Sequence, residues 1–544
     1  MPASTSPVSP SAVTPRKSEL LMPAGSLSCL KTALLYGADA VYAGTPDLSL
    51  RTQSEFSVDD LAEGIALTHA AGKRIYLTLN LFTHNRDVET LARFKDLLSD
   101  LRPDGIIVAD PGVFQFFKDE APWLERHIST QANVSSFLTV DYWQKQGAAL
   151  CVLSREVSFE ELSEIRERSP NIRLETFIHG ALCMTYSGRC LLSNYMAERG
   201  SNQGNCAHSC RWKYNLKVAR ADGTTEVMEI TDKNMDDFKF FLEEEFRPGQ
   251  LFPIEEDERG SYILNSRDLC LMPKLDQYLK LGVDSLKVEG RNKNEYYVGL
   301  VARAYRQAID AYYADPEAWD FRPFMSELEA TKSRGYTLGF HEGRLTNLAH
   351  DYENGQSLSA FEFAGFVREW EADALVVELR NRWLPGDILE FLPPGDLSAV
   401  RLRLYDLIDA ASLEKKEKLS AGDGRAARIP MSLFHNEDQS SLRQRLPLGT
   451  LVRKRALLNA EQAGFLKANQ QAQKAELGLI PASALVASAR SKEVRPPPRL
   501  GLEGCCGLGC NGCLMFWNEP KFEGARAKLK VARPGTLLAA DWAK

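Results

Sequence analysis

The sequence predicts an α/β protein: a (β/α)8-type barrel, then a small antiparallel β-barrel domain and a cysteine-rich C-terminal tail. Short apolar runs alternate with helical patterns from residue 18 to about residue 300, which is typical of parallel strands covered by helices. No glycine-rich dinucleotide fingerprint accompanies them, and this favours a barrel over a doubly wound sheet. After about residue 335 the runs become short and β-like, which indicates the second domain.

The strands of the predicted barrel are aliphatic runs that end at a polar residue or a glycine. They are expected at Glu19–Gly25, Ala40–Gly44, Arg74–Asn80, Gly105–Asp110, His127–Asn133, Leu150–Glu156, Arg173–Gly180, Tyr262–Cys270 and Ser285–Arg291. The clearest helix lies at 157–170, with Leu162 and Ile165 on its apolar side. An acidic and aromatic stretch at about 230–260 interrupts the pattern, and we expect an insertion there that carries one helix.

Composition sets the domain organisation. A chain of 544 residues is too long for one ordinary domain. We expect five parts, which are a disordered tail (1–17), the barrel (18–334), the small β domain (335–455), a helical and proline-rich linker (456–500) and a cysteine-rich basic tail (501–544).

Charge and hydropathy indicate a cytoplasmic enzyme. The net charge of −7 gives no global attraction to nucleic acid, so RNA binding would depend on local basic patches. No stretch is long and apolar enough to span a membrane, and the N-terminal residues lack the apolar centre of a secretory signal. The reducing cytosol argues against structural disulfides.

Polar residues follow the apolar part of most expected strands. In a barrel the carboxyl ends of the strands share one rim, where active sites form. The alternative for each residue is that it caps the following helix. The residues are Asn80, Asp110, Gln131, Asn133, Arg155, Glu156, His179, Glu289 and Arg291.

Eight of the eleven cysteines form two groups. The first is Cys183, Cys190, Cys206 and Cys210. Only its last two members have the tight spacing of a zinc pair, so the irregular set favours a 4Fe–4S cluster, with zinc and unliganded thiols as alternatives. The second group, in the glycine-rich tail, favours a second metal site, iron–sulfur or zinc, over a flexible redox-active tail. Its members are Cys505, Cys506, Cys510 and Cys513.

The stretch "ETFIHGALCMTYSGRCLLS" resembles the signature of the collagenase-like peptidase family. The signature positions are filled by Glu175, Phe177, Gly180, Cys183, Gly188, Cys190 and Ser193. The resemblance continues through "ELLMPAGS", "YGADAVYAG", "SLKVEGR" and "LVRKR", and so covers most of residues 18–455.

The family name implies proteolysis, but the sequence holds neither an HExxH motif nor a Ser/His/Asp order. Characterised members of the family are oxygen-independent hydroxylases with a 4Fe–4S cluster on four cysteines. "NQGNCAHSCRWKY" is similar to the branch that acts on tRNA. The resemblance thus implies an RNA-modifying hydroxylase that forms 5-hydroxyuridine at the wobble position of tRNA, with prephenate as co-substrate. A cysteine-based or metal-dependent peptidase, a ribosomal RNA cytidine hydroxylase and a quinone-hydroxylase subunit are the alternatives.

The resemblance implies that the first cysteine group holds the cluster. The expected position at the rim makes His179 and Glu289 the acid–base candidates. Guanidinium groups match carboxylates, so four arginines are candidate anchors for prephenate, namely Arg51, Arg155, Arg189 and Arg291. Further substrate contacts, including stacking on a splayed base, would come from Gln131, Asn133, Tyr186 and Trp212.

Overall fold

The computed structural model describes residues 17–45, 56–80, 83–182, 240–243, 251–257, 260–262, 266–343, 349, 357–422, 424–434 and 438–479. These residues belong to two compact units. The first holds a barrel and an antiparallel sheet, and the second holds three short strands between residues 240 and 262.

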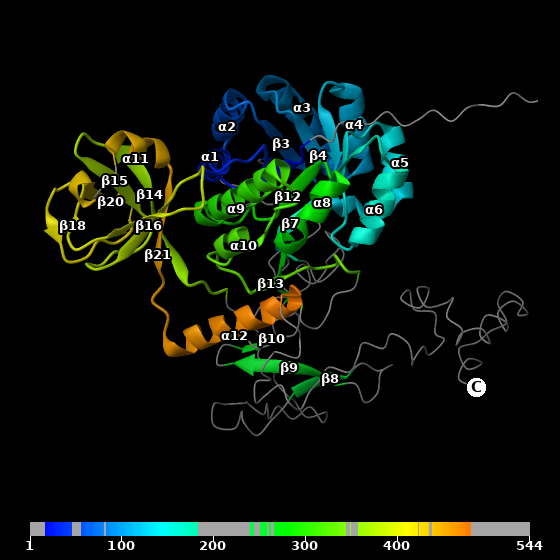
Figure 1. Ribbon diagram of the computed structural model, residues 1–544. Helices are drawn as coiled ribbons and strands as arrows, with labels where there is room; N and C mark the ends of the chain where they lie inside the picture. The colour runs from blue at the N-terminus through cyan, green and yellow to red at the C-terminus, as the bar shows by residue number, and fades with distance from the viewer. Residues whose placement is uncertain are drawn as a thin grey trace, which may run out of the picture. The chain divides into compact units, whose positions relative to one another are not determined.

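Eight parallel strands close into a barrel in the first unit (Figure 1). The last strand, β12, pairs with both β1 and β7 and so completes the ring. The strands are β1 (Glu19–Ala24), β2 (Ala40–Gly44), β3 (Arg74–Leu79), β4 (Gly105–Val108), β5 (Glu125–Ile128), β6 (Leu150–Val152), β7 (Arg173–Ala181) and β12 (Ser285–Val288). The predicted (β/α)8-type barrel is confirmed.

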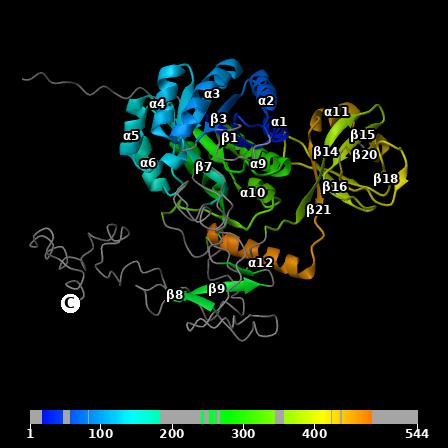
Figure 2. The same ribbon diagram turned by 180° about the vertical axis from the view of Figure 1, so that it is seen from behind.

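Helices surround the strands, as Figures 1 and 2 show from both sides. They are α1 (Leu27–Leu35), α2 (Val58–Ala70), α3 (Val88–Leu101), α4 (Pro111–Glu120), α5 (Phe137–Gln146), α6 (Phe159–Arg168), α8 (Leu275–Leu281) and α9 (Glu295–Ala314). Serine side chains cap α1, α2, α5 and α6 by accepting backbone N–H groups. Asp110, a predicted rim residue, caps α4 in the same way.

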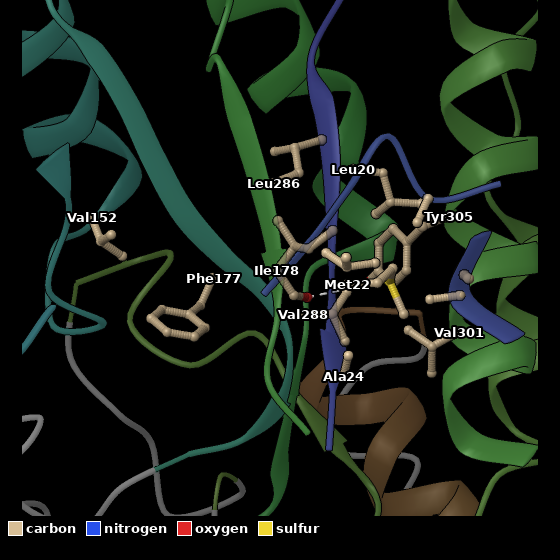
Figure 3. Packing of buried hydrophobic residues seen from close by; sticks show 14 of the residues in the cluster. Leu20, Met22, Ala24, Val152, Phe177, Ile178, Leu286, Val288, Val301 and Tyr305 are labelled. Carbon is tan, nitrogen blue, oxygen red and sulfur yellow. Dashed lines mark hydrogen bonds between the residues drawn. The ribbon is translucent and has the colours of Figure 1, made fainter. Parts of the chain in front are cut away.

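The main core lies between the barrel strands and the helices. Figure 3 shows Leu20, Met22 and Ala24 of β1 facing Val301 and Tyr305 of α9. These side chains are buried, because alternate residues of each strand point to the helices. The other residues of each strand point into the barrel and supply its interior.

Two expected strands differ from the structure. The run expected at His127–Asn133 ends as a strand at Ile128 and continues as a 3-10 helix at Thr130–Ala132. The run expected at Tyr262–Cys270 contains β11 (Asp268–Cys270), which is antiparallel to β7 and is not one of the eight barrel strands. It pairs with the end of β7, which is nine residues long, and so satisfies backbone groups there.

The second part of the first unit is a curled antiparallel sheet of six strands. Its order is β17 (Val400–Arg403), β16 (Ile388–Leu392), β21 (Leu451–Arg455), β14 (Phe361–Trp370), β15 (Ala374–Leu379) and β20 (Ala426–Pro430). A separate core that includes Trp383, Phe391 and Val452 fills it. Two short strands, β18 (Leu407–Ile408) and β19 (Lys415–Lys416), and α11 (Gln439–Arg445) complete this part.

Three further elements flank the barrel: α10 (Arg322–Leu328), β13 (Tyr336–Thr337) and α12 (Ala460–Glu476). Strand β13 pairs in parallel with β11. The side chain of Gln473 on α12 accepts the backbone N–H of Tyr336 at 3.1 Å, so α12 packs against β13. No helix in the described ranges has both the length and the apolar character needed to cross a membrane.

The second unit corrects one expectation. The insertion was expected to carry a helix, but its described residues form an antiparallel sheet of β8 (Phe240–Glu243), β9 (Leu251–Asp257) and β10 (Gly260–Tyr262). Phenylalanines and isoleucine in these segments favour strands, and this preference outweighed the acidic pattern that suggested a solvated helix.

The hydroxyl of Tyr36 joins the barrel to the curled sheet. It donates to the carbonyl of Leu392 at 2.7 Å and accepts the backbone N–H of Leu451 at 2.8 Å. Tyr36 is only 1% exposed, so both backbone groups lack water as a substitute partner.

We predict that Tyr36→Phe lowers the free energy of unfolding by about 2–4 kcal/mol, because two buried backbone groups lose their partner. Urea denaturation of the purified variant measures the change. Tyr142→Phe, on the half-exposed Tyr142 of α5, is the matched control and is expected to leave the midpoint unchanged. Equal midpoints for both variants would contradict the structural role of the Tyr36 hydroxyl.

Candidate active site at the carboxyl end of the barrel

The motif "SLKVEGR" forms β12 and the rim that follows it. Leu286 and Val288 point toward α9, as Figure 3 shows. The alternate residues face the barrel interior and then its carboxyl-end rim, and each has a polar partner on another strand or on the loop that follows one. They are Ser285, Lys287, Glu289 and Arg291.

Lys287 lies inside the barrel in an ion pair with Glu175 of β7. Its Nζ is 2.7 Å from Glu175 Oε1, and the Ser285 hydroxyl donates to Glu175 Oε2 at 2.9 Å. The Glu175 side chain is 0% exposed and that of Lys287 is 6% exposed. The ammonium also lies 4.4 Å from the centre of the Tyr42 ring. Both charges are therefore compensated within the barrel.

Arg155, which follows β6, lies at the rim next to this pair. Its guanidinium forms an ion pair with Glu289 at 3.0 Å and stacks 3.8 Å from the centre of the Phe177 ring. A predicted anchor and a predicted acid–base residue are thus in contact. The stacking explains the phenylalanine of the family signature, because it fixes the plane of the guanidinium.

Arg291 lies on the other side of β12. One of its nitrogens donates to the hydroxyl of Thr78 on β3 at 2.6 Å. Its backbone carbonyl leaves no room for a side chain at Gly25, since an added Cβ would be 1.9 Å from that oxygen. The glycine that ends "ELLMPAG" therefore permits close packing of the rim loops after β1 and β12.

His179 does not face the barrel interior. The pairing of β7 with β12 shifts register between Lys287 and Val288, so Val288 lies opposite His179 and Ile178 is the extra residue of a bulge. The imidazole lies among the rings of Tyr297, Tyr305 and Tyr336 at 5.2–6.0 Å.

Burial lowers the pKa of His179 to about 3, so the ring is neutral at pH 7. Its Nδ1 lies 3.4 Å from the Tyr305 hydroxyl. A neutral, buried imidazole among tyrosines is suited to positioning the end of β7, and proton exchange with a ligand at the rim would require a route through other groups.

Gly180 follows His179 and has φ +110°, a conformation that side-chain-bearing residues rarely adopt. An added Cβ would be 2.4 Å from the carbonyl oxygen of Glu289. The signature glycine thus lets the end of β7 approach the loop after β12. Cys183 comes three residues later in the sequence.

Three buried oxygen atoms at the rim have no hydrogen-bond partner among the described residues. They are Asn80 Oδ1 after β3, Asn133 Oδ1 after β5 and Ser154 Oγ after β6. Leaving a buried polar group unsatisfied costs about 1–3 kcal/mol, so native proteins keep few such groups. Gln131 differs, because its amide oxygen accepts the Ser129 hydroxyl at 3.1 Å.

Several predicted site residues lie outside the described residues. They are Arg51, Cys183, Tyr186, Arg189, Cys190, Cys206, Cys210, Trp212, Cys505, Cys506, Cys510 and Cys513. Within the described ranges no three histidine, cysteine, aspartate or glutamate side chains gather as a metal site. The three described cysteines are buried, and burial raises the thiol pKa of Cys151 and Cys270 to about 12, which disfavours the thiolate form that binds metals.

Comparison with known families agrees with this geometry. Residues 25–350 match the model of peptidase family U32. The chain belongs to peptidase family U32. The match includes seven of the eight barrel strands, all but β1. It also includes the rim residues described above.

Several relatives of the chain are named for the hydroxylation of RNA. The chain is 40% identical to "tRNA hydroxylation protein P" of Escherichia coli over 435 residues, which are 76% of this chain and 94% of that protein. It is 36% identical to "tRNA hydroxylation protein P1" of Bacillus subtilis over 70% of this chain and 84% of that protein. It is 31% identical to the "23S rRNA 5-hydroxycytidine C2501 synthase" of Escherichia coli, over 55% of this chain and 40% of that protein.

Sequence reasoning missed Lys287 and the roles of Glu175 and Ser154. The sequence identifies Glu175 only as a signature position. Lys287 lies within an expected strand, and its charge was not given a role. The signal was present, because a charged residue at every second position of "SLKVEGR" places those side chains on one face of a strand.

We predict that Lys287→Met lowers the free energy of unfolding by about 3–5 kcal/mol, because Glu175 keeps a buried charge without its partner. The double variant Glu175→Gln/Lys287→Met is expected to lose much less than the two single variants together. Urea denaturation of all three measures the coupling. Lys145→Met, which removes the exposed Lys145–Asp141 pair, controls for charge loss and is expected to cost less than about 1 kcal/mol. Additive single effects would contradict the paired arrangement.

Proposed function

We propose that this U32 protein is an RNA-modifying hydroxylase that acts on tRNA. The observation that carries the proposal is the match to "tRNA hydroxylation protein P", which extends over 94% of that protein. A barrel with charged and unsatisfied polar groups gathered at the carboxyl end of its strands supports an enzyme site there.

The finer proposal is that the chain forms 5-hydroxyuridine at the wobble position without oxygen, with prephenate as co-substrate and a 4Fe–4S cluster. Cys183 begins the proposed ligand set, and in the sequence it follows the last residue of β7 by two positions. Four thiolates are the donor set that iron–sulfur clusters use. When bound, the cluster would supply redox or Lewis-acid chemistry, and a second metal site in the tail stays a prediction.

Arg155 and Arg291 are suited to bind the two carboxylates of prephenate. Arg155 bonds to Glu289 and stacks on Phe177, and Arg291 bonds to Thr78 of β3. These contacts hold both guanidinium groups in place. Pre-ordering of this kind reduces the entropy lost on binding. A carboxylate at Arg155 would compete with Glu289, and a displaced Glu289 would then be available to accept a proton at the rim.

The nucleobase would bind beside these arginines. Asn80, Asn133 and Ser154 present buried oxygen atoms without partners among the described residues, and the N3–H of uracil is a donor that such an oxygen can accept. Single-stranded bases can be splayed out and read on this edge. In this proposal the unsatisfied oxygen atoms of the rim bind the nucleobase, and the two arginines bind prephenate.

A peptidase is the second candidate, because the family carries that name. Neither Cys151 nor Cys270 is an activated nucleophile, since burial raises the pKa of both thiols, and His179 contacts tyrosines. A ribosomal RNA substrate is the third, supported by the 31% identity to the cytidine synthase. A quinone-hydroxylase subunit has no support in these relatives.

We predict that tRNA nucleosides from a strain lacking this gene lose 5-hydroxyuridine and its derivatives, and that the wild-type gene restores them. Liquid chromatography with mass spectrometry measures the nucleosides after anaerobic growth, which removes any contribution from oxygen-dependent enzymes. Arg155→Met and Arg291→Met are expected to fail in restoration. Normal tRNA nucleosides in the deletion strain, with loss of 5-hydroxycytidine from ribosomal RNA, would instead favour the ribosomal alternative.

We predict that anaerobically purified protein contains iron and acid-labile sulfide and shows broad visible absorbance, and that Cys183→Ala loses all three. Metal analysis and absorbance spectra measure this without any activity assay. Cys151→Ala, at a buried cysteine of β6, is the matched control and is expected to keep its iron. Zinc without iron in the wild-type protein would rule out the cluster.

A further inference from the structure

A pocket of about 650 Å³ lies where the curled sheet, the segment after α10 and the start of α12 meet. Polar side chains from five segments of the chain line it. They include Lys332, Ser357, Asn381, Arg382, Lys454 and Gln462. None of these residues takes part in the site at the barrel rim.

The pocket carries two cations that are not used by the fold. Lys454 adds no positive charge, because its Nζ lies 2.9 Å from Asp387 and 3.2 Å from Glu362, and the three side chains together carry one negative charge. The two other cations of the pocket exceed this charge. Lys332 and Arg382 are exposed, and neither forms an ion pair in the part of the chain that the structure describes. The positive charge of the pocket is thus available to a ligand.

The uncharged groups of the pocket are hydrogen-bond donors. The amide oxygen of Asn381 accepts the backbone N–H of Arg382 at 2.8 Å, and that of Gln462 accepts the backbone N–H of Asn459 at 3.2 Å. The nitrogen of each amide group carries two hydrogens that it can donate. Two cations with two amide donors match a sugar–phosphate backbone, which presents only acceptors at its phosphates.

The pocket is structurally continuous with the carboxyl end of β7. Lys332 precedes β13 by four positions, and Tyr336 of β13 packs against His179 with ring centres 5.2 Å apart. Helix α12, which starts at the pocket, bonds to β13 through Gln473. Strand β13 and helix α12 thus link the residues of the pocket to the end of β7.

We propose that this pocket binds phosphates of the RNA substrate, outside the nucleotide that is modified. The inference rests on the proposed function, since it names a docking surface for the same tRNA. It gives the curled sheet a role in substrate binding, with Lys332 and Arg382 as the phosphate contacts. These contacts position the RNA and do not read its sequence.

The test measures the affinity of the full-length protein for a fluorescent tRNA transcript with uridine at the wobble position, between about 50 and 200 mM salt. Lys332→Ala and Arg382→Ala are each expected to weaken binding about fivefold and to reduce the slope of log affinity against log salt by about 0.7–0.9. Lys280→Ala on α8 and Arg93→Ala on α3, which are exposed cations of the barrel helices, are the matched controls and are expected to bind as the wild type does.

The outcomes separate the two proposals. If the wild type binds tRNA with a salt slope that the Lys332 and Arg382 variants retain, the pocket does not contact phosphate and the proposed function stands. If the wild type has no measurable affinity for tRNA, both proposals fail. A second readout is hydroxylation by the variants, which is expected to fall at limiting tRNA and to recover at saturating tRNA.

Discussion

The closure of the barrel between β7 and β12 depends on one buried carboxylate. Glu175 accepts hydrogen bonds from both Ser285 and Lys287, so one side chain joins the last strand to the seventh. The next side chains on the same face of the two strands are Phe177 and Glu289, and both contact Arg155 at the rim. The buried Glu175 thus helps to position the charged groups at the rim.

Phe177, a signature position, and His179, two residues later, have different roles in this arrangement. Phe177 points into the barrel and supports the Arg155 guanidinium, whereas the bulge at Ile178 turns His179 toward the tyrosines of α9. Because of the one extra residue in β7, Phe177 contacts a residue of the site whereas His179 packs in the core. Gly180 then brings the chain back against Glu289 before the cysteines begin.

Much of the fold could be predicted from the sequence, because apolar runs in parallel strands depend only on burial of both faces. Seven of the nine expected runs begin at the same residue as a barrel strand. The pattern could not show that β11 runs antiparallel to β7, since the direction of pairing is set by long-range contacts. Pattern reading also placed polar residues at the rim. It could not find the bulge at Ile178, because a bulge leaves no mark in hydrophobic alternation, and so the burial of His179 was not foreseen.

The hydroxyl of Tyr36 has a consequence for synthesis of the chain. Its backbone partner at Leu451 lies 415 residues further along, and β1 must likewise wait for β12. At about 5–20 residues per second, a ribosome needs roughly 20–80 seconds to cover that distance. During this time one edge of β1 has no partner strand and the Tyr36 hydroxyl is bonded to water, so the barrel can close only after most of the chain has been made.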